Sequence, residues 1–226
     1  MSIYVMSDIH GNADAFFRML REINFTGSDI LYVLGDVIDR NPGSVEVLRY
    51  IKQQSNIVML MGNHELMMTE YNNGNDFSGN WDYNGGEETR ALLNNLEKDE
   101  RSELIEWVEN LPLRQSVYIK GVEYVLCHAC PFASDKHRTV WERIDPSEKI
   151  KSESNKKYII GHTPTLHFGY SSCGAKMVKN IDENLYYIDC GAAYTDYSGA
   201  RLCCLRLEDE KEFYVNAAEK ASGRCA

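Results

Sequence analysis

Short apolar runs alternate with helical patterns along the first sixty residues. Apolar side chains fill residues 2–7, 29–35 and 56–62 almost without interruption, which is typical of strands buried on both faces in a parallel sheet with helices on either side. Between these runs, apolar positions recur every three or four residues, and Asn12 and Asn41 stand where two helices would begin. The order β-α-β-α-β predicts parallel strands joined by right-handed crossovers.

Each of these strands ends in polar side chains that are suited to chemistry. The set consists of Asp8 and His10 after the first strand, Asp36, Asp39 and Arg40 after the second, and Asn63, His64 and Glu65 after the third. Two later apolar runs, at 122–131 and 157–164, carry His128 and His162 at their ends. Ligands of open α/β sheets bind beyond the carboxyl ends of the strands, so we expect these groups to meet at one edge. One such residue alone is more often a turn residue, but the combination predicts a metal site.

The remaining chain predicts further elements without an obvious linker or repeat. Residues 66–114 are long enough to be an insertion, in which 71–89 predict a loop over the site and 97–112 an amphipathic helix. Within that loop, Trp81 and Tyr83 either contact a substrate or anchor the loop. Strand-like runs in the last third predict a second, β-rich sheet. We therefore expect residues 1–226 to form one domain.

Composition narrows the classes of partner. The net charge of −10 argues against nucleic acid and anionic membranes as partners. No run of eighteen apolar residues is present, and the N-terminus resembles a strand more than a signal peptide, which predicts a cytoplasmic protein. The seven cysteines follow no regular framework, so reduced thiols are expected. Cys127 and Cys130 have CxxC spacing, for which a structural role is favoured over a redox or zinc role. The oligomeric state is left open.

Five segments resemble the signature blocks of the calcineurin-like metallophosphoesterases. They are DIHGN, GDVIDR, GNHE, CHACP and GHTP, which together span residues 8–164. Their spacing is most similar to the phosphoprotein phosphatase branch, especially the small bacterial and bacteriophage lambda type serine/threonine phosphatases. The resemblance implies an α/β fold in which a two-sheet β-sandwich is flanked by helices, a four-layer αββα arrangement. It also implies two divalent metal ions, with Mn²⁺ as the usual activator and Fe or Zn as alternatives.

The same resemblance assigns roles to individual residues. It implies that Asp8, His10 and Asp36 hold one metal ion, and that Asp36, Asn63, His128 and His162 hold the other. Two such ions clamp the phosphoryl oxygens and activate a water that attacks phosphorus directly. Arg40 and Arg143, the latter from the block TVWERID, are implied as clamps for the phosphoryl group. His64 is implied as the general acid with Asp39 as its partner, although Asp39 could instead cap the following helix.

Three functions are compatible with this site. The main prediction is a metal-dependent protein serine/threonine phosphatase, with a phosphoprotein or a small phosphoester as substrate. The alternative is a diadenosine tetraphosphate or nucleotide phosphohydrolase on the same metal core. Glu65 favours the first, because the resemblance implies Asp at this place in the symmetrical diadenosine tetraphosphate hydrolases. A third possibility, an inactive binding domain, is disfavoured by the presence of His64, Asp39 and Arg40 together.

Overall fold

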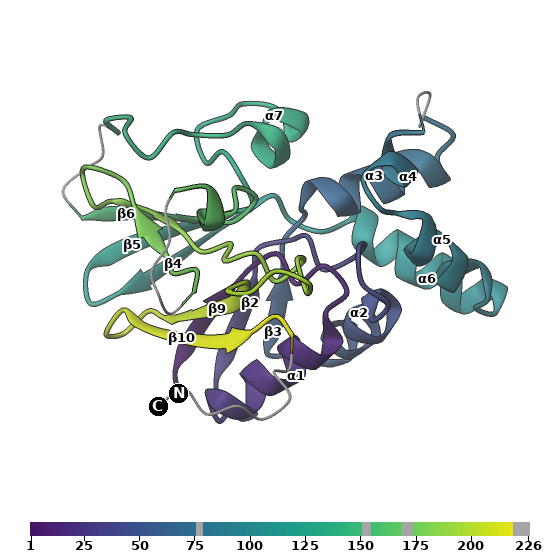
Figure 1. Ribbon diagram of the computed structural model, residues 1–226, viewed down its shortest axis with the longest axis horizontal. Helices are drawn as coiled ribbons and strands as arrows, with labels where there is room; N and C mark the ends of the chain where they lie inside the picture. The colour runs from purple at the N-terminus through teal and green to yellow at the C-terminus, as the bar shows by residue number, and fades with distance from the viewer. Residues whose placement is uncertain (76–78, 151–154, 169–173, 219–226) are drawn as a thin grey trace.

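Two five-stranded sheets pack face to face in the part of the chain that the structure describes. The computed structural model describes residues 1–75, 79–150, 155–168 and 174–218. Figure 1 shows α1 and α2 below one sheet and α7 above the other, so that helices flank the pair of sheets. This arrangement confirms the α/β sandwich with helical outer layers that the motifs imply.

The first sheet contains the three parallel strands predicted from the apolar runs. They are β1 (Ile3–Met6), β2 (Ile30–Val33) and β3 (Ile57–Met59), joined by α1 (Ala13–Glu22) and α2 (Ser44–Gln53). β9 (Arg201–Arg206) and β10 (Lys211–Asn216) continue the same sheet, in the order β10-β9-β1-β2-β3. β9 pairs antiparallel with β1. The prediction that the last third forms a separate sheet is therefore wrong for these two strands.

The second sheet has the order β4-β5-β6-β8-β7. Its strands are β4 (Arg114–Ile119), β5 (Val122–Cys127), β6 (Lys156–Ile160), β7 (Val178–Lys179) and β8 (Leu185–Tyr187). β5, β6 and β8 run parallel, so the carboxyl ends of β5 and β6 lie at one edge of this sheet.

The alternation of side chains along β1 shows how the layers are held together. Tyr4 and Met6 pack in the core beneath the helices, whereas Ile3 and Val5 pack between the two sheets. The first sheet thus has helices on one face only, and the second sheet takes the place of the helices that were expected on its other face. Full burial of one such aliphatic side chain stabilises the fold by about 1.5–3 kcal/mol, so both faces contribute to stability.

The two helix starts differ in whether they follow the sequence prediction. The Asn12 side chain accepts a hydrogen bond from the Ala15 amide at 3.0 Å, which confirms it as the cap of α1. α2 begins after Gly43 instead of Asn41. The Asn41 amide donates to the carbonyl of His10 at 2.9 Å, so this side chain braces a loop of the site and does not cap a helix.

Helices occupy most of the segment between β3 and β4. They are α3 (Asn63–Asn72), α4 (Asn80–Tyr83), α5 (Glu87–Asn94) and α6 (Lys98–Glu109), followed later in the chain by α7 (Lys136–Trp141) and the 3₁₀ turn η1 (Thr165–His167). The expected loop at 71–89 thus contains helical turns, and residues 76–78 of it lie outside the described part. Leu104 and Val108 of α6 face inward as the periodicity predicts.

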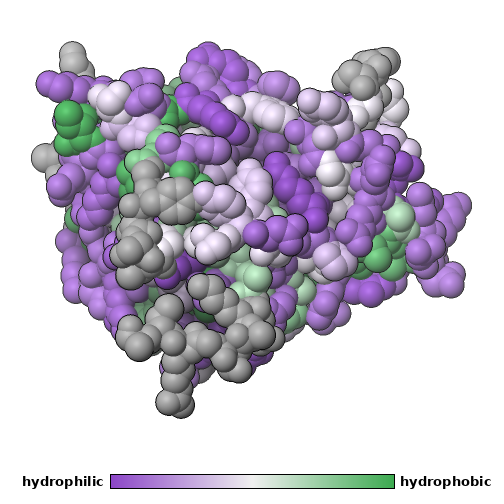
Figure 2. All heavy atoms as spheres, in the orientation of Figure 1, coloured by the Kyte–Doolittle hydropathy of each residue, from purple (hydrophilic) through white to green (hydrophobic). Residues whose placement is uncertain are grey.

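Polar side chains dominate the face of the molecule seen in Figure 2, where hydrophobic ones form small separate groups. None of the helices described by the structure is both long enough and apolar enough to cross a membrane.

Glu210, in the turn between β9 and β10, ties the first sheet to the second. Its carboxylate accepts hydrogen bonds from the hydroxyls of Tyr124 at 3.2 Å and Tyr186 at 2.9 Å. It also pairs with the ammonium groups of Lys157 and Lys179. Although burial opposes its charged form, Lys157, Tyr186 and Lys179 lower the pKa of Glu210 to about 2.

We expect Glu210→Gln to lower the free energy of unfolding by about 1–2 kcal/mol at pH 7, since the carboxylate is partly exposed and its ion pairs are screened. A depressed pKa stabilises the folded state above the unfolded pKa of about 4.3. The difference between wild type and variant should therefore shrink as the pH falls from about 5 towards 2. Urea unfolding across this range measures it. Asp209→Asn, at the exposed neighbour that pairs with Arg206, is the control and should lower the free energy of unfolding less than Glu210→Gln does.

Candidate functional site

The carboxyl ends of five strands meet around a small hollow between the two sheets. It has a volume of about 80 Å³ and is lined by Asp8, His10, Asp36, Arg40, Asn63, Asn84, Trp141, Arg143, His162, Pro164, Asp189 and Tyr194. Seven of the ten predicted site residues line the hollow. The other three, Asp39, His64 and His128, are completely buried behind it. The structure therefore brings together all ten of these residues.

The loops that carry these residues have an unusual backbone. Six of the ten non-glycine residues with positive φ in the described chain belong to the site, namely Asp8, His10, Asp36, Asp39, Arg40 and His162. This conformation costs a residue with a side chain about 1–2 kcal/mol and persists only where the surroundings enforce it. Main-chain bonds between the loops do so here, such as the His10 amide to the Asp36 carbonyl at 2.8 Å. The strain concentrates where side chains must converge.

Two glycines allow the ligand carboxylates to approach neighbouring strands. A Cβ atom on Gly161 would lie 2.0 Å from Oδ2 of Asp8, and one on Gly62 would lie 2.3 Å from Oδ1 of Asp36. Both distances are shorter than any van der Waals contact. The glycines of the GHTP and GNHE segments are therefore needed because the two carboxylates occupy the space of a side chain.

The first ligand cluster is built around His10. Its Nε2 lies 3.5 Å from Oδ2 of Asp36 and 4.0 Å from Oδ1 of Asp8. Its Nδ1 lies 3.1 Å from the carbonyl of Ile38, to which it donates. That hydrogen bond fixes the tautomer and leaves the lone pair of Nε2 directed at the carboxylates, as in histidines that bind metals.

The second ligand cluster shares Asp36 with the first. Oδ1 of Asp36 lies 3.4 Å from Nε2 of His128, and Oδ1 of Asn63 lies 2.9 Å from both this nitrogen and Nδ1 of His162. The other ring nitrogen of each histidine faces a main-chain carbonyl. Nδ1 of His128 lies 2.7 Å from the carbonyl oxygen of Leu34, and Nε2 of His162 lies 3.1 Å from that of Trp141. Each cluster presents oxygen and imidazole donors with their second hydrogen bonds already made.

Burial sets the charge of these groups. It raises the pKa of Asp8 well above its usual range, with further contributions from Asp189 and Asp36, and it raises the pKa of Asp189 to about 7. Burial also lowers the pKa of His10 and that of His162, the latter to about 3. Neutral imidazoles are the form that binds metals, and crowded carboxylates favour a bound cation. The donor set therefore fits two divalent cations.

Arg40 lies directly against the first cluster. Its guanidinium donates to Nε2 of His10 at 3.2 Å and to Nε2 of His64 at 3.1 Å. Because a guanidinium and a metal ion cannot share one lone pair, a cation bound by His10 requires the Arg40 side chain to rotate away. His64 also lies close to His10 and Asp36, so geometry alone would allow it as a ligand.

A buried hydrogen-bond chain holds His64. Its Nδ1 lies 2.6 Å from Oδ2 of Asp39, and the indole of Trp81 donates to the same oxygen at 2.9 Å. Although burial opposes the charged form, the Asp36 and Asp39 carboxylates raise the pKa of His64. The Asp39 carboxylate thus faces His64 and does not cap α2. Trp81 acts as an anchor behind it, whereas Tyr83 is 90% exposed and makes no comparable contact in the described structure.

Cys127 and Cys130 are buried free thiols in this structure. Burial raises the pKa of Cys127 to about 11, so it holds almost no thiolate near neutral pH. Burial of both thiols supports the structural role favoured from the sequence. Cys173 and Cys225 lie outside the described residues.

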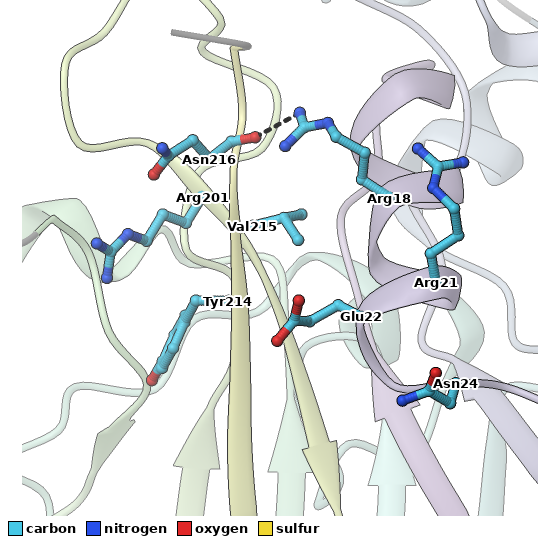
Figure 3. A pocket seen from close by; sticks show the side chains of 8 residues that line it. All are labelled: Arg18, Arg21, Glu22, Asn24, Arg201, Tyr214, Val215 and Asn216. Atoms are coloured by element: carbon cyan, nitrogen blue, oxygen red, sulfur yellow. Dashed lines mark hydrogen bonds between the residues drawn. The ribbon is translucent and has the colours of Figure 1, made fainter. Parts of the chain in front are cut away.

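A roomier hollow lies elsewhere, between α1 and β10. It measures about 660 Å³ and contains none of the predicted residues. Figure 3 shows Arg201 pointing away from Arg18 and Arg21, while Arg18 donates to the carbonyl of Asn216 at 2.7 Å. The arginine side chains of this larger hollow do not point to a common centre. The smaller hollow, where the metal-ligand side chains converge, is therefore the candidate active site.

Comparison with known proteins identifies the family to which the chain belongs. The sequence pattern of the calcineurin-like phosphoesterase family matches residues 1–190. A symmetrical bis(5'-nucleosyl)-tetraphosphatase of Citrobacter koseri is 36% identical over 117 residues, which is 51% of this chain and 39% of that protein. Its counterpart from Acidovorax sp. strain JS42 is 35% identical over 131 residues, 57% of this chain and 44% of that protein. The matches therefore span about two fifths of these relatives.

Solved structures share the fold at low sequence identity. A protein described as a candidate diadenosine tetraphosphatase has a TM-score of 0.66 at 16% identity, with 95% of this chain and 92% of that chain covered. A serine/threonine phosphatase from Saccharomyces cerevisiae has a TM-score of 0.63 at 16% identity, with 97% and 81% covered. These likenesses confirm the fold.

The curated relatives overturn the main functional prediction. Protein serine/threonine phosphatase was favoured because of Glu65, but the relatives above are named symmetrical tetraphosphatases, in agreement with the alternative. The error has a physical cause. Both oxygens of Glu65 accept main-chain N–H groups, those of Asp36, Val37 and Gly62 at 2.8–2.9 Å. The side chain is fully buried, so it supports the site loop and does not report on the substrate.

We expect Glu65→Asp to lower the free energy of unfolding by about 1–3 kcal/mol, because the shorter side chain leaves buried N–H groups without an acceptor. The ratio of kcat/KM between diadenosine tetraphosphate and p-nitrophenyl phosphate should change by less than about twofold. Urea unfolding and paired assays measure both. A large change of substrate preference in this variant would show that residue 65 does select the substrate.

The two-sheet fold and the match over residues 1–190 agree. The chain belongs to the calcineurin-like phosphoesterase family, whose members are metal-dependent phosphoester hydrolases.

Proposed function

We propose that this chain hydrolyses dinucleoside tetraphosphates symmetrically, releasing two nucleoside diphosphates. The observation that carries the proposal is the pair of ligand clusters that share Asp36 in a hollow also lined by Arg40 and Arg143. In such a site, metal ions and arginine side chains bind the negatively charged phosphates, and a water molecule can attack phosphorus without a nucleophilic side chain. The substrate class is drawn from the names of the curated relatives.

The donor groups suggest how the cations would be held. Asp8, His10 and Asp36 would hold one ion, and Asp36, Asn63, His128 and His162 the second. We propose Mn²⁺, with Fe and Zn as alternatives, because mixed oxygen and imidazole donors accept all three. When bound, the two ions polarise the phosphoryl oxygens and lower the pKa of the attacking water.

The chain supplies the remaining functions through its own side chains. Arg40 leaves His10 and His64 and, with Arg143, holds the phosphoryl oxygens by charge-assisted hydrogen bonds. His64, oriented by Asp39, delivers a proton to the departing phosphate. Trp81 keeps Asp39 in place by its indole hydrogen bond.

An assay of four substrates tests the proposal. Chelator-treated protein reloaded with Mn²⁺, Fe²⁺ or Zn²⁺ is incubated with diadenosine tetraphosphate, p-nitrophenyl phosphate, a phosphoserine peptide and a phosphotyrosine peptide. We expect metal-dependent hydrolysis with the highest kcat/KM for the dinucleotide and ADP as its only product. Chromatography separates ADP from the ATP and AMP of asymmetric cleavage.

Two results would contradict the proposal. The first is ATP and AMP as products, which would place the attack at the wrong phosphorus. The second is hydrolysis of p-nitrophenyl phosphate without hydrolysis of the dinucleotide, which would leave a phosphoesterase of another substrate class. Full activity after exhaustive chelation would show that hydrolysis does not depend on bound metal ions.

A further inference from the structure

A second pocket adjoins the hollow at the metal-ligand clusters. It measures about 350 Å³ and shares Arg143 with that hollow. It lies beside α7, which Figure 1 places above the second sheet. Its volume falls within the range of small-molecule sites, about 300–1,000 Å³. A ligand that spans both spaces would pass over Arg143.

The inner wall of this pocket is apolar and carries one accessible aromatic ring. Cys130, Ala133 and Ile144 are almost fully buried there. Phe132 is 49% exposed, and its ring packs edge-on against Tyr158 with centroids 4.8 Å apart. Tyr158 thus packs against the ring, and about half of the surface of Phe132 stays open to a ligand. A fixed aromatic face loses little entropy when a flat ring stacks on it.

The charged lining of the pocket has one more basic than acidic side chain, on a chain whose net charge is −10. Arg138, Arg143 and Lys149 line it together with Glu142 and Glu148. Arg138 engages Glu142 at 2.7 Å, so Arg143 and Lys149 are the lining cations outside that ion pair. Arg143 is exposed, so its guanidinium can reach a phosphate.

We propose that this pocket is a nucleoside subsite, in which the base stacks on Phe132 and the adjoining phosphates pass Arg143 towards the metal ligands. The inference rests on the proposed function, since it identifies where one end of a dinucleotide lies. Stacking on an aromatic side chain contributes about 1–3 kcal/mol per base, enough for Phe132 to determine affinity for nucleotides over simple phosphates.

Binding measurements test the subsite without relying on turnover. Metal-loaded protein is titrated calorimetrically with ADP and, separately, with pyrophosphate, which lacks the nucleoside. We expect Phe132→Ala to weaken ADP binding about 5- to 50-fold and pyrophosphate binding less than about twofold. Phe132→Trp should restore ADP affinity. Tyr118→Ala, at an exposed aromatic residue of β4, is the matched control and should change neither.

The outcomes separate the subsite from the proposed function. Equal losses for ADP and pyrophosphate, or no loss for ADP, overturn the subsite. A selective loss of ADP affinity supports it even in a protein that turns over no dinucleotide, in which case only the proposed function fails. Where the dinucleotide is a substrate, Phe132→Ala should raise its KM by a similar factor and change kcat by less than about twofold.

Discussion

Replacing Asp36 with Asn is expected to abolish occupancy of at least one metal position and to lower kcat by at least about 10³-fold. Both ligand clusters include this carboxylate, through Oδ2 towards His10 and Oδ1 towards His128. An amide keeps the volume but offers only one oxygen and no negative charge. Elemental analysis of desalted protein should find two ions per wild-type chain and at most one per variant chain.

A second readout of the same variant is thermodynamic. An ion that binds only the folded state stabilises it by about 2.7 kcal/mol at one hundred times its dissociation constant. Mn²⁺ should therefore raise the unfolding temperature of the wild type more than that of Asp36→Asn. Asp14→Asn is the control, since that carboxylate is exposed on α1 and pairs with Arg18. Two retained ions in the Asp36 variant would disprove a shared ligand.

The sequence was informative wherever a strand ended, because an apolar run followed by acids, amides and histidines has few structural explanations. The directions of the parallel strands then decided that Asp8, Asp36 and Asn63 meet. Alternation along a strand could not decide what covers each face, so the second sheet above Ile3 and Val5 was taken for helices. Nor could local pattern show that β9 pairs with β1, some two hundred residues away.

Other features depended on contacts that no local pattern reveals. Trp81 lies in a segment rich in Asn and Gly, yet its indole binds Asp39 forty-two residues earlier. Glu65 was interpreted as a substrate marker because the resemblance implies Asp at this place in the symmetrical diadenosine tetraphosphate hydrolases. Its side chain, however, turns back towards the main chain of the β2 loop. Chemistry at a strand end is readable from sequence, but the direction of each side chain is not.

His64→Asn should keep both metal ions and slow hydrolysis according to the leaving group. For phenyl phosphate, whose leaving phenol has a pKa of about 10, as in tyrosine, we expect kcat to fall about 10²-fold, within the usual range for loss of a general acid. p-Nitrophenyl phosphate and diadenosine tetraphosphate release weaker bases, so their losses should be less than about tenfold. His167→Asn, at an exposed histidine of η1, is the control and should leave all rates unchanged.

The position of Arg40 makes this test decisive between two roles for His64. With Arg40 donating to Nε2 of His64 and Asp39 bound at Nδ1, the imidazole has no proton to give at the nitrogen that faces the hollow. Rotation of Arg40 towards the phosphoryl group frees Nε2 for a proton, which the neighbouring carboxylates favour by raising the pKa of His64. If His64 is instead a ligand beside His10 and Asp36, His64→Asn loses an ion and slows every substrate equally. Asp39→Asn should then have no leaving-group dependence either, whereas a general acid that has lost its orienting carboxylate should slow phenyl phosphate most.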